Sequence, residues 1–196
     1  MRRRSEQVQP LWACGGRAVN LETITFYSYK GGVGRTLAVA NVAYYLAQLG
    51  QKVVAIDFDL EAPGLHYKLP LASDRDSKHR LGLVDYITGV IEGEEDPRQI
   101  GKYLTKFQSA AELPGEIWML PAGSAPHPSY WEKLSRLDWQ YLIYGDGTQG
   151  TLLFLEMREA LRATVNPDFI LIDSRTGITE IGGVATALLA ANPFVC

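Results

Sequence analysis

A glycine-rich segment, YSYKGGVGRT, runs from Tyr27 to Thr36 and contains the residue types that bind phosphate. Three glycines stand where backbone amides must turn inward around an anion, namely Gly31, Gly32 and Gly34. A helix that begins near Arg35 adds the positive end of its dipole at the same place. The Thr36 hydroxyl suits a magnesium ion that bridges two phosphates. The segment therefore predicts a loop that holds a nucleotide phosphate chain together with magnesium.

Arg35 stands where a phosphate-binding loop ordinarily has a lysine. Arginine keeps the positive charge and can bind phosphate through two nitrogens, but its side chain is longer and planar. We expect nucleotide binding to survive this replacement and hydrolysis to be slowed. The alternative interpretation is a glycine-rich turn without a ligand. It is disfavoured because two cations, Lys30 and Arg35, and the Thr36 hydroxyl accompany the glycines between a strand and a helix.

Aspartates follow two segments that are apolar almost throughout. Asp57 ends the run KVVAID, Asp59 follows two residues later, and Asp173 ends the run DFILID. Continuous apolar runs are typical of strands that are buried on both faces of a parallel sheet. Taken singly, each aspartate is best interpreted as a strand-end cap or turn residue. Because ligands bind beyond the carboxyl ends of such strands, we expect all three to face the phosphate loop.

The hydrophobic pattern predicts the elements that position these residues. Strands are expected at 24–28, 52–57, 117–123, 168–173 and from 193 onward. Helices are expected at 36–50, 81–93, 129–144, 151–165 and 180–192, with an acidic turn that leads into a further helix at 94–107. Strands that alternate with helices predict an α/β fold, a doubly wound and mainly parallel sheet with helices on both faces.

The composition is that of an ordinary globular protein. A chain of 196 residues, with 46% apolar and 21% charged residues, suits one α/β domain. A net charge of -3 argues against a domain built mainly to grip nucleic acid. No apolar run has the length of a membrane span, and the start MRRR lacks the apolar part of a secretory signal. Cys14 and Cys196 have no metal-ligand spacing, so we expect a soluble, cytoplasmic protein with free thiols.

Three segments, KGGVGRT, VVAIDFDLEAPGL and DFILIDSRTG, resemble the deviant Walker A P-loop ATPases, the ParA/MinD class of the SIMIBI group. The resemblance covers residues 23–192, and it is strongest to a subgroup that carries KGGVGR. It implies the P-loop NTPase fold. It also divides the chain into a flexible leader, 1–21, and an NTPase domain, 22–196. Relatives continue with further strands, so the resemblance implies that C-terminal strands are missing from this sequence.

The resemblance further implies ATP and Mg2+ as ligands and an ATP-dependent homodimer. Lys30 would reach the nucleotide bound by the facing subunit, Asp59 would orient the attacking water, and Gly177 would sense the γ-phosphate. The implied magnesium residues are Thr36, Asp57 and Asp173, and the implied catalytic residues are Lys30, Arg35 and Asp59. The implied nucleotide-binding residues are Lys30, Gly31, Gly32, Val33, Gly34, Arg35, Thr36, Leu37 and Gly177.

Two further features have alternative interpretations. Arg175 follows a strand-end aspartate where many relatives have prolines; it either supplies charge to the transition state or forms an ion pair, which we favour. The aromatic segment 130–144 is either a partner-binding patch or, as we favour, a helix packed on its own sheet. The three histidines, His66, His79 and His127, have no metal-ligand spacing and are interpreted as ordinary surface or loop residues.

The favoured function is an ATPase that acts as a nucleotide-dependent dimerisation switch for an unidentified protein partner. A regulatory module that binds a nucleotide and scarcely hydrolyses it is the second hypothesis, because Arg35 replaces the lysine. A protein kinase of the bacterial tyrosine kinase branch is the third, and it is less favoured because this sequence has no tyrosine-rich tail. The sequence has no clear signal for nucleic-acid binding and no membrane segment.

Overall fold

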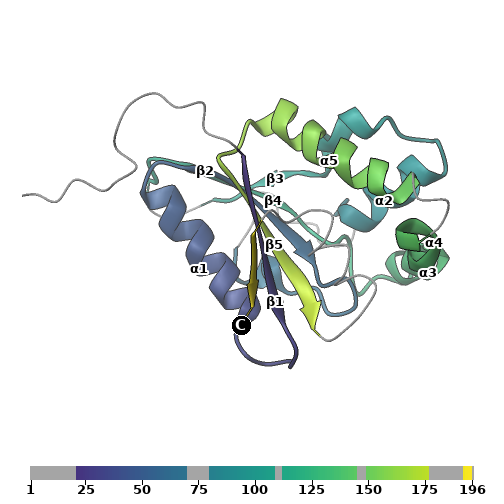
Figure 1. Ribbon diagram of the computed structural model, residues 1–196, viewed down its shortest axis with the longest axis horizontal. Coiled ribbons are helices and arrows are strands. Elements are labelled where there is room, and N and C mark those ends of the chain that lie inside the picture. The colour runs from purple at the N-terminus through teal and green to yellow at the C-terminus, as the bar shows by residue number, and fades with distance from the viewer. Residues whose placement is uncertain (1–20, 70–79, 109–111, 145–148, 177–191, 196) are drawn as a thin grey trace, which may run out of the picture.

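The computed structural model describes residues 21–69, 80–108, 112–144, 149–176 and 192–195. Its centre is a six-stranded sheet with the strand order β3-β4-β2-β5-β1-β6 (Figure 1). The strands are β1 (Glu22–Ser28), β2 (Lys52–Phe58), β3 (Thr105–Lys106), β4 (Glu116–Leu120), β5 (Phe169–Thr176) and β6 (Asn192–Val195). Neighbouring strands are parallel, except that β3 runs antiparallel to β4. The mainly parallel sheet expected from the sequence is therefore confirmed.

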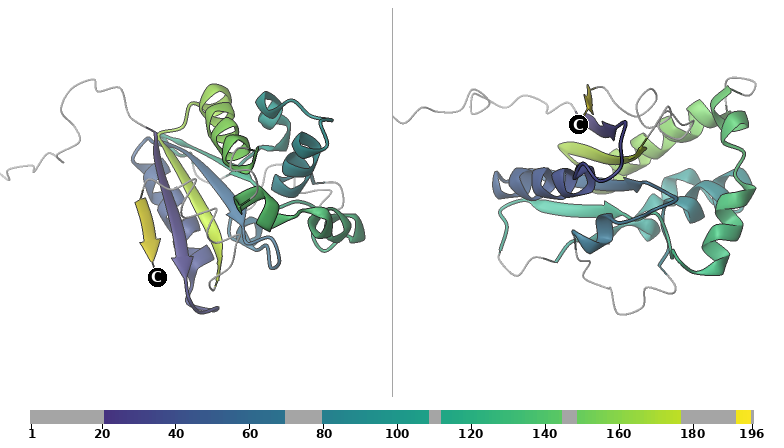
Figure 2. Two further views of the ribbon diagram at one scale, coloured as in Figure 1. Left: turned by 45° about the vertical axis from the view of Figure 1, so that its right-hand side comes forward. Right: turned by 90° about the horizontal axis from the view of Figure 1, so that it is seen from below.

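Helices cover both faces of this sheet (Figures 1 and 2). One face carries α1 (Arg35–Gln48) and the short 3₁₀ helix η1 (Leu65–Tyr67). The other carries α2 (Leu83–Ile91), the 3₁₀ helix η3 (Pro97–Tyr103), α3 (Pro128–Arg136), α4 (Trp139–Tyr144) and α5 (Gln149–Val165). A hydrophobic cluster fills the space between the sheet and each helical layer. The fold is thus doubly wound, as the alternation of strands and helices predicts.

Strand β2 contributes side chains to both hydrophobic clusters. Val54 and Ile56 pack on the side of α5, whereas Val53 and Ala55 pack on the side of α1. Successive side chains of a strand point to opposite faces, so a strand covered on both faces needs apolar residues throughout. This explains the run KVVAID and fixes where its last residue, Asp57, must lie.

The single helix expected at 129–144 is wrong. The structure has two helices there, α3 ending at Arg136 and α4 beginning at Trp139. Leu137 has extended backbone angles, and the Asp138 carboxylate accepts a hydrogen bond from the Tyr141 amide at 2.9 Å. Asp138 therefore caps the start of a new helix, which the apolar period of the segment does not reveal. Tyr130 in α3 is buried in the core, as the packing interpretation requires.

The segment 94–107 also differs from its prediction. Asp96 caps the 3₁₀ helix η3 by accepting from the Arg98 amide at 2.9 Å, and Pro97 occupies the first helical position. The chain then becomes extended at Leu104 and forms the two-residue strand β3 at the sheet edge. A regular α-helix up to residue 107 is therefore wrong.

Strand ends differ by a few residues from the expected limits. Strand β4 ends at Leu120 because Pro121, which has no amide hydrogen, follows it. Strand β5 continues past Asp173 to Thr176, so Arg175 lies on the strand. The strand expected from residue 193 is confirmed as β6, which pairs with β1.

Some expectations fall outside the described residues. These are residues 1–20 of the leader expected at 1–21, His79, both cysteines, Gly177 and most of the helix expected at 180–192. Among the helices that the structure describes, none combines the length and the apolar character that a membrane crossing requires.

Candidate functional site

The carboxyl ends of β1, β2 and β5 meet at one edge of the sheet. Strands β2 and β5 are neighbours, and Asp57 lies directly opposite Asp173 in their register. Strand β1 borders β5 on its other side and leads into the glycine-rich loop. The convergence of three separate sequence segments is therefore confirmed.

The glycine-rich loop has a backbone that favours glycine at two positions. Gly32 and Gly34 have positive φ angles of 76° and 86°. Gly34 is also the N-cap residue of α1, and its carbonyl accepts the first helical hydrogen bond, from the Ala38 amide at 2.9 Å. The loop therefore ends by directing the start of a 14-residue helix, with its positive dipole end, toward the strand ends.

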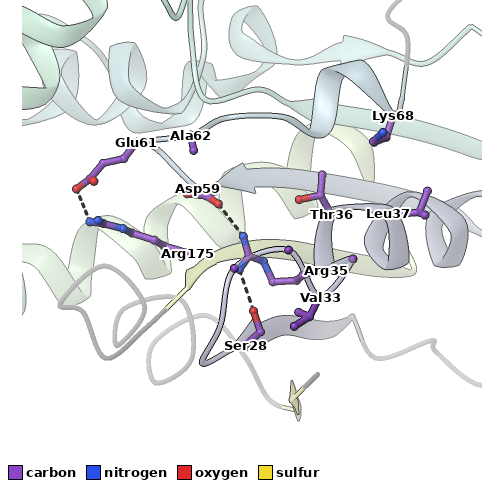
Figure 3. A pocket seen from close by; sticks show the side chains of 13 residues that line it. Ser28, Val33, Arg35, Thr36, Leu37, Asp59, Glu61, Ala62, Lys68 and Arg175 are labelled. Atoms are coloured by element: carbon purple, nitrogen blue, oxygen red, sulfur yellow. Dashed lines mark hydrogen bonds and ion pairs between the residues drawn. The ribbon is translucent and has the colours of Figure 1, made fainter.

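A cavity of about 670 Å³ lies above this loop (Figure 3). Its walls include residues 31–37, which are all of the predicted nucleotide-binding loop except Lys30, and Asp59. Glu61, Lys68 and Arg175 also line it, from the loop after β2 and from the end of β5. The volume falls in the range typical of small-molecule sites.

Arg35 does not extend freely into this cavity, because its side chain is 5% exposed and each of its three guanidinium nitrogens donates a hydrogen bond. Its Nε donates to Asp173 Oδ1 and its Nη2 donates to Asp59 Oδ2, each at 2.7 Å. Its Nη1 donates to the Ser28 hydroxyl at 3.2 Å (Figure 3). The planar guanidinium thus joins residues from β1, the end of β2 and β5. Arg35 also lines the cavity, so a phosphate bound there would compete with Asp59 and Asp173 for its guanidinium.

The Asp173 side chain is fully buried, and its two oxygens differ in their contacts. Oδ1 accepts from Arg35, whereas Oδ2 has no hydrogen-bond partner among the described residues. Burial raises the pKa of Asp173, and hydrogen bonds from Arg35 and Thr36 oppose this shift. A buried carboxylate oxygen beside a threonine hydroxyl offers the hard oxygens that Mg2+ prefers, so Thr36 and Asp173 fit a magnesium site. The described residues contain no cluster of three or more potential metal-binding side chains.

Asp57 organises the loop after β2. One of its carboxylate oxygens accepts from the amides of Gly64 and Leu65 at 3.2 and 3.1 Å, and the other from the Asp59 amide at 3.4 Å. Burial, aided by the charge of Asp173, raises the pKa of Asp57 to about 8. Asp57 is not among the residues that line the cavity, so its observed contacts are those of a loop support.

Asp59 and Lys30 differ in how they relate to the cavity. The Asp59 side chain is 15% exposed, lines the cavity and pairs with Arg35. Burial raises the pKa of Asp59, and the charge of Arg35 opposes the shift. Lys30 is exposed and is not among the lining residues, although its carbonyl accepts from the Ser28 hydroxyl at 3.1 Å.

Sequence reasoning missed several residues at this site. Ser28, Glu61 and Lys68 line the cavity, and no spacing pattern singles them out. Arg175 forms an ion pair with Glu61 at the cavity (Figure 3). The ion pair is the interpretation of Arg175 that the sequence favours.

A protein-family model matches most of the chain. Residues 24–193 match the CobQ/CobB/MinD/ParA nucleotide binding domain. The chain belongs to this family. The matched range includes the glycine-rich loop and all three strand-end aspartates, Asp57, Asp59 and Asp173.

Individual relatives match over short stretches. An uncharacterized ATP-binding protein of Methanocaldococcus jannaschii is 41% identical over 58 residues, which is 30% of this chain and 22% of that protein. The septum site-determining protein MinD of Helicobacter pylori is 54% identical over 37 residues, which is 19% of this chain and 14% of that protein. The matched stretches thus span less than a quarter of either relative.

Solved structures share the fold along most of this chain. Pyrococcus horikoshii MinD, in complex with Mg-ADP, has a TM-score of 0.59 and 24% identity, and the match covers 90% of this chain and 57% of MinD. Cobyrinic acid a,c-diamide synthase of Mycobacterium smegmatis, with ADP and magnesium, has a TM-score of 0.60 and 18% identity over 90% of this chain and 59% of the synthase. These likenesses establish the P-loop NTPase fold.

The raised pKa of Asp57 predicts a pH-dependent effect of Asp57→Asn on stability. Between pH 4 and about 8 the folded wild type holds a proton on Asp57 that the unfolded chain has released. The free energy of unfolding of the wild type therefore decreases as pH rises through this window. The variant lacks this contribution, so its stability relative to the wild type should rise by up to about 1.4 kcal/mol per pH unit.

Urea unfolding of both proteins between pH 5 and 8 measures this difference. The control is Asp138→Asn, which replaces an exposed helix cap by another good cap and should give a constant difference. If the difference in unfolding free energy between Asp57→Asn and the wild type were also independent of pH, the raised pKa of Asp57 would be contradicted.

Proposed function

We propose that this domain binds ATP with magnesium, hydrolyses it slowly, and uses the bound nucleotide to control its own dimerisation. The observation that carries the proposal is the joining of Asp59 and Asp173 by Arg35 at the wall of the glycine-loop cavity. A phosphate chain in this cavity lies beside backbone amides, a helix N-terminus and hard oxygen groups at the same time. These are the parts that phosphoryl transfer needs.

Each residue has a role that its position supports. Residues 31–37 bind the phosphates through backbone amides, and Thr36 and Asp173 hold magnesium, which neutralises charge on the phosphates. Asp59 lines the cavity and accepts a hydrogen bond from the attacking water. Asp57 keeps Asp59 in place by fixing the loop after β2. Gly177, which lies outside the described residues, is proposed to sense the γ-phosphate.

Arg35 is the reason to expect slow turnover. Its guanidinium holds the carboxylate of Asp59 at 2.7 Å, and the same carboxylate must be available to orient water. A regulatory module that binds ATP and scarcely hydrolyses it is therefore the second candidate function. The kinase hypothesis has no comparable support from the contacts of the site.

Lys30 supports the dimerisation part of the proposal. It is exposed and is not among the residues that line its own cavity. A lysine placed in this way is available to a nucleotide bound by a second copy of the chain, as the resemblance to the ParA/MinD class implies. The partner that responds to the dimer is proposed to be a protein.

Replacing Asp59 by asparagine tests the catalytic assignment. Asp59→Asn should lower kcat for ATP by at least about 100-fold because the water loses its carboxylate acceptor. ATP affinity should be retained or increased, because the variant removes negative charge from an anion-binding cavity. Phosphate release and binding of a fluorescent ATP analogue measure the two quantities.

Asp138→Asn, at an exposed helix cap, is the matched control and should leave both quantities unchanged. Equal turnover in Asp59→Asn and wild type would refute the role of Asp59. ATP binding without measurable wild-type turnover would favour the regulatory module.

Removing Lys30 tests dimerisation separately from binding. Lys30→Ala should abolish the ATP- and magnesium-dependent dimer while changing the affinity of the monomer for ADP by less than about threefold, since Lys30 is exposed. Light scattering after size exclusion, with and without ATP and magnesium, measures the mass. Arg136→Ala, which removes one exposed positive charge from α3, is the control. A wild type that stays monomeric both with and without ATP and magnesium would refute the proposed dimerisation switch.

A further inference from the structure

The Arg35 guanidinium occupies the space between two carboxylates that the proposed function assigns to metal and water. Nε and Nη2 form one edge of the guanidinium fork, and each donates a 2.7 Å hydrogen bond to a different aspartate, Asp173 and Asp59. The third nitrogen, Nη1, donates to Ser28. The Arg35 side chain is only 5% exposed, so the guanidinium is almost completely enclosed by protein atoms. One edge of a planar fork can join two carboxylates in this way.

Charge explains why this position needs a cation. Burial raises the pKa values of Asp57 and Asp59, and the charge of Asp173 raises both further. Among the ion pairs of the described residues, Arg35 is the cation that contacts both Asp59 and Asp173. Arg175 also lowers the pKa of Asp59, but its own ion pair is with Glu61.

The same pair of carboxylates has the chemistry of a divalent-cation site. Carboxylate oxygens are the preferred ligands of Mg2+ and Mn2+, and the buried Asp173 Oδ2 has no hydrogen-bond partner within the part of the chain that the structure describes. A cation that approaches Asp59 and Asp173 meets the positive guanidinium already paired with both. Arg35 and a divalent cation therefore compete for these oxygens.

We propose that Arg35 is an internal cation that excludes free divalent metal from the nucleotide-free protein. Arg35 releases the carboxylates only when another anion attracts its guanidinium, and the phosphates of a nucleotide in the adjoining cavity provide that anion. The consequence is ordered binding: metal enters with the nucleotide and not before it. This inference deepens the proposed function and rests on it.

Manganese binding to the nucleotide-free protein tests the inference. The electron paramagnetic resonance signal of free Mn2+ gives the affinity, and thermal unfolding with and without MnCl2 gives an independent reading. Arg35→Gln should bind Mn2+ at least about tenfold more tightly than the wild type, because a positive charge leaves the carboxylates. Arg35→Lys, which keeps the charge, should stay within about threefold of the wild type.

Arg175→Gln is the matched control, because it removes a positive charge from the same cavity without touching Asp59 or Asp173. An equal gain in Mn2+ affinity for Arg175→Gln would overturn the inference, since the effect would be general electrostatics. The wild type gives a second test. Tight Mn2+ binding by the nucleotide-free wild type, lost in Asp59→Asn, would also overturn it.

A fluorescent ATP analogue separates this inference from the proposed function. If the wild type binds the analogue and also binds free Mn2+ tightly, the exclusion by Arg35 is wrong and the proposed function stands. If the wild type binds no ATP but Arg35→Gln gains Mn2+ affinity as expected, the proposed function is wrong and Arg35 still acts as the internal cation.

Discussion

The bridge from Arg35 to Asp59 and Asp173 is the interaction on which the arrangement of the site depends. Three aspartates gather where β2 and β5 end, and two of them, Asp57 and Asp173, are fully buried. Buried carboxylates are costly unless a cation or hydrogen bonds compensate them. Arg35 supplies the cation and backbone amides supply the bonds to Asp57. Removing one partner of such a buried pair typically costs about 3–5 kcal/mol.

This constraint links the fold to the function of a CobQ/CobB/MinD/ParA domain. The doubly wound sheet places the carboxylates at the strand ends, and the glycine-rich loop places the start of α1 beside them. The same carboxylates that lower stability when their charge is uncompensated have the hard oxygens that a metal ion prefers. We propose that Arg35, which pairs with two of these carboxylates, thereby decides when a metal can enter. In this proposal Arg35 affects both the stability of the site and the binding of its ligands.

The sequence predicts the position of the site better than its contacts. Apolar runs covered on both faces end in Asp57 and Asp173, and period and topology suffice to bring these residues together. The direction of the Arg35 side chain depends on three partners, and two of them, Asp59 and Asp173, come from distant segments that no local pattern specifies. The support of the loop by Asp57 depends on amides up to eight residues away. The sequence does not predict the break at Asp138, because the apolar residues keep a helical period across it and only the cap formed by Asp138 starts a new helix.

A double-mutant cycle between Arg35 and Asp173 measures the central interaction most directly. The proteins are the wild type, Arg35→Gln, Asp173→Asn and the double variant, compared by urea unfolding at neutral pH without nucleotide. If the two buried side chains form the bridge, their coupling energy should exceed about 1 kcal/mol, and the double variant should be more stable than the single changes predict by addition. Additivity within about 0.5 kcal/mol would contradict the bridge and the role assigned to Arg35.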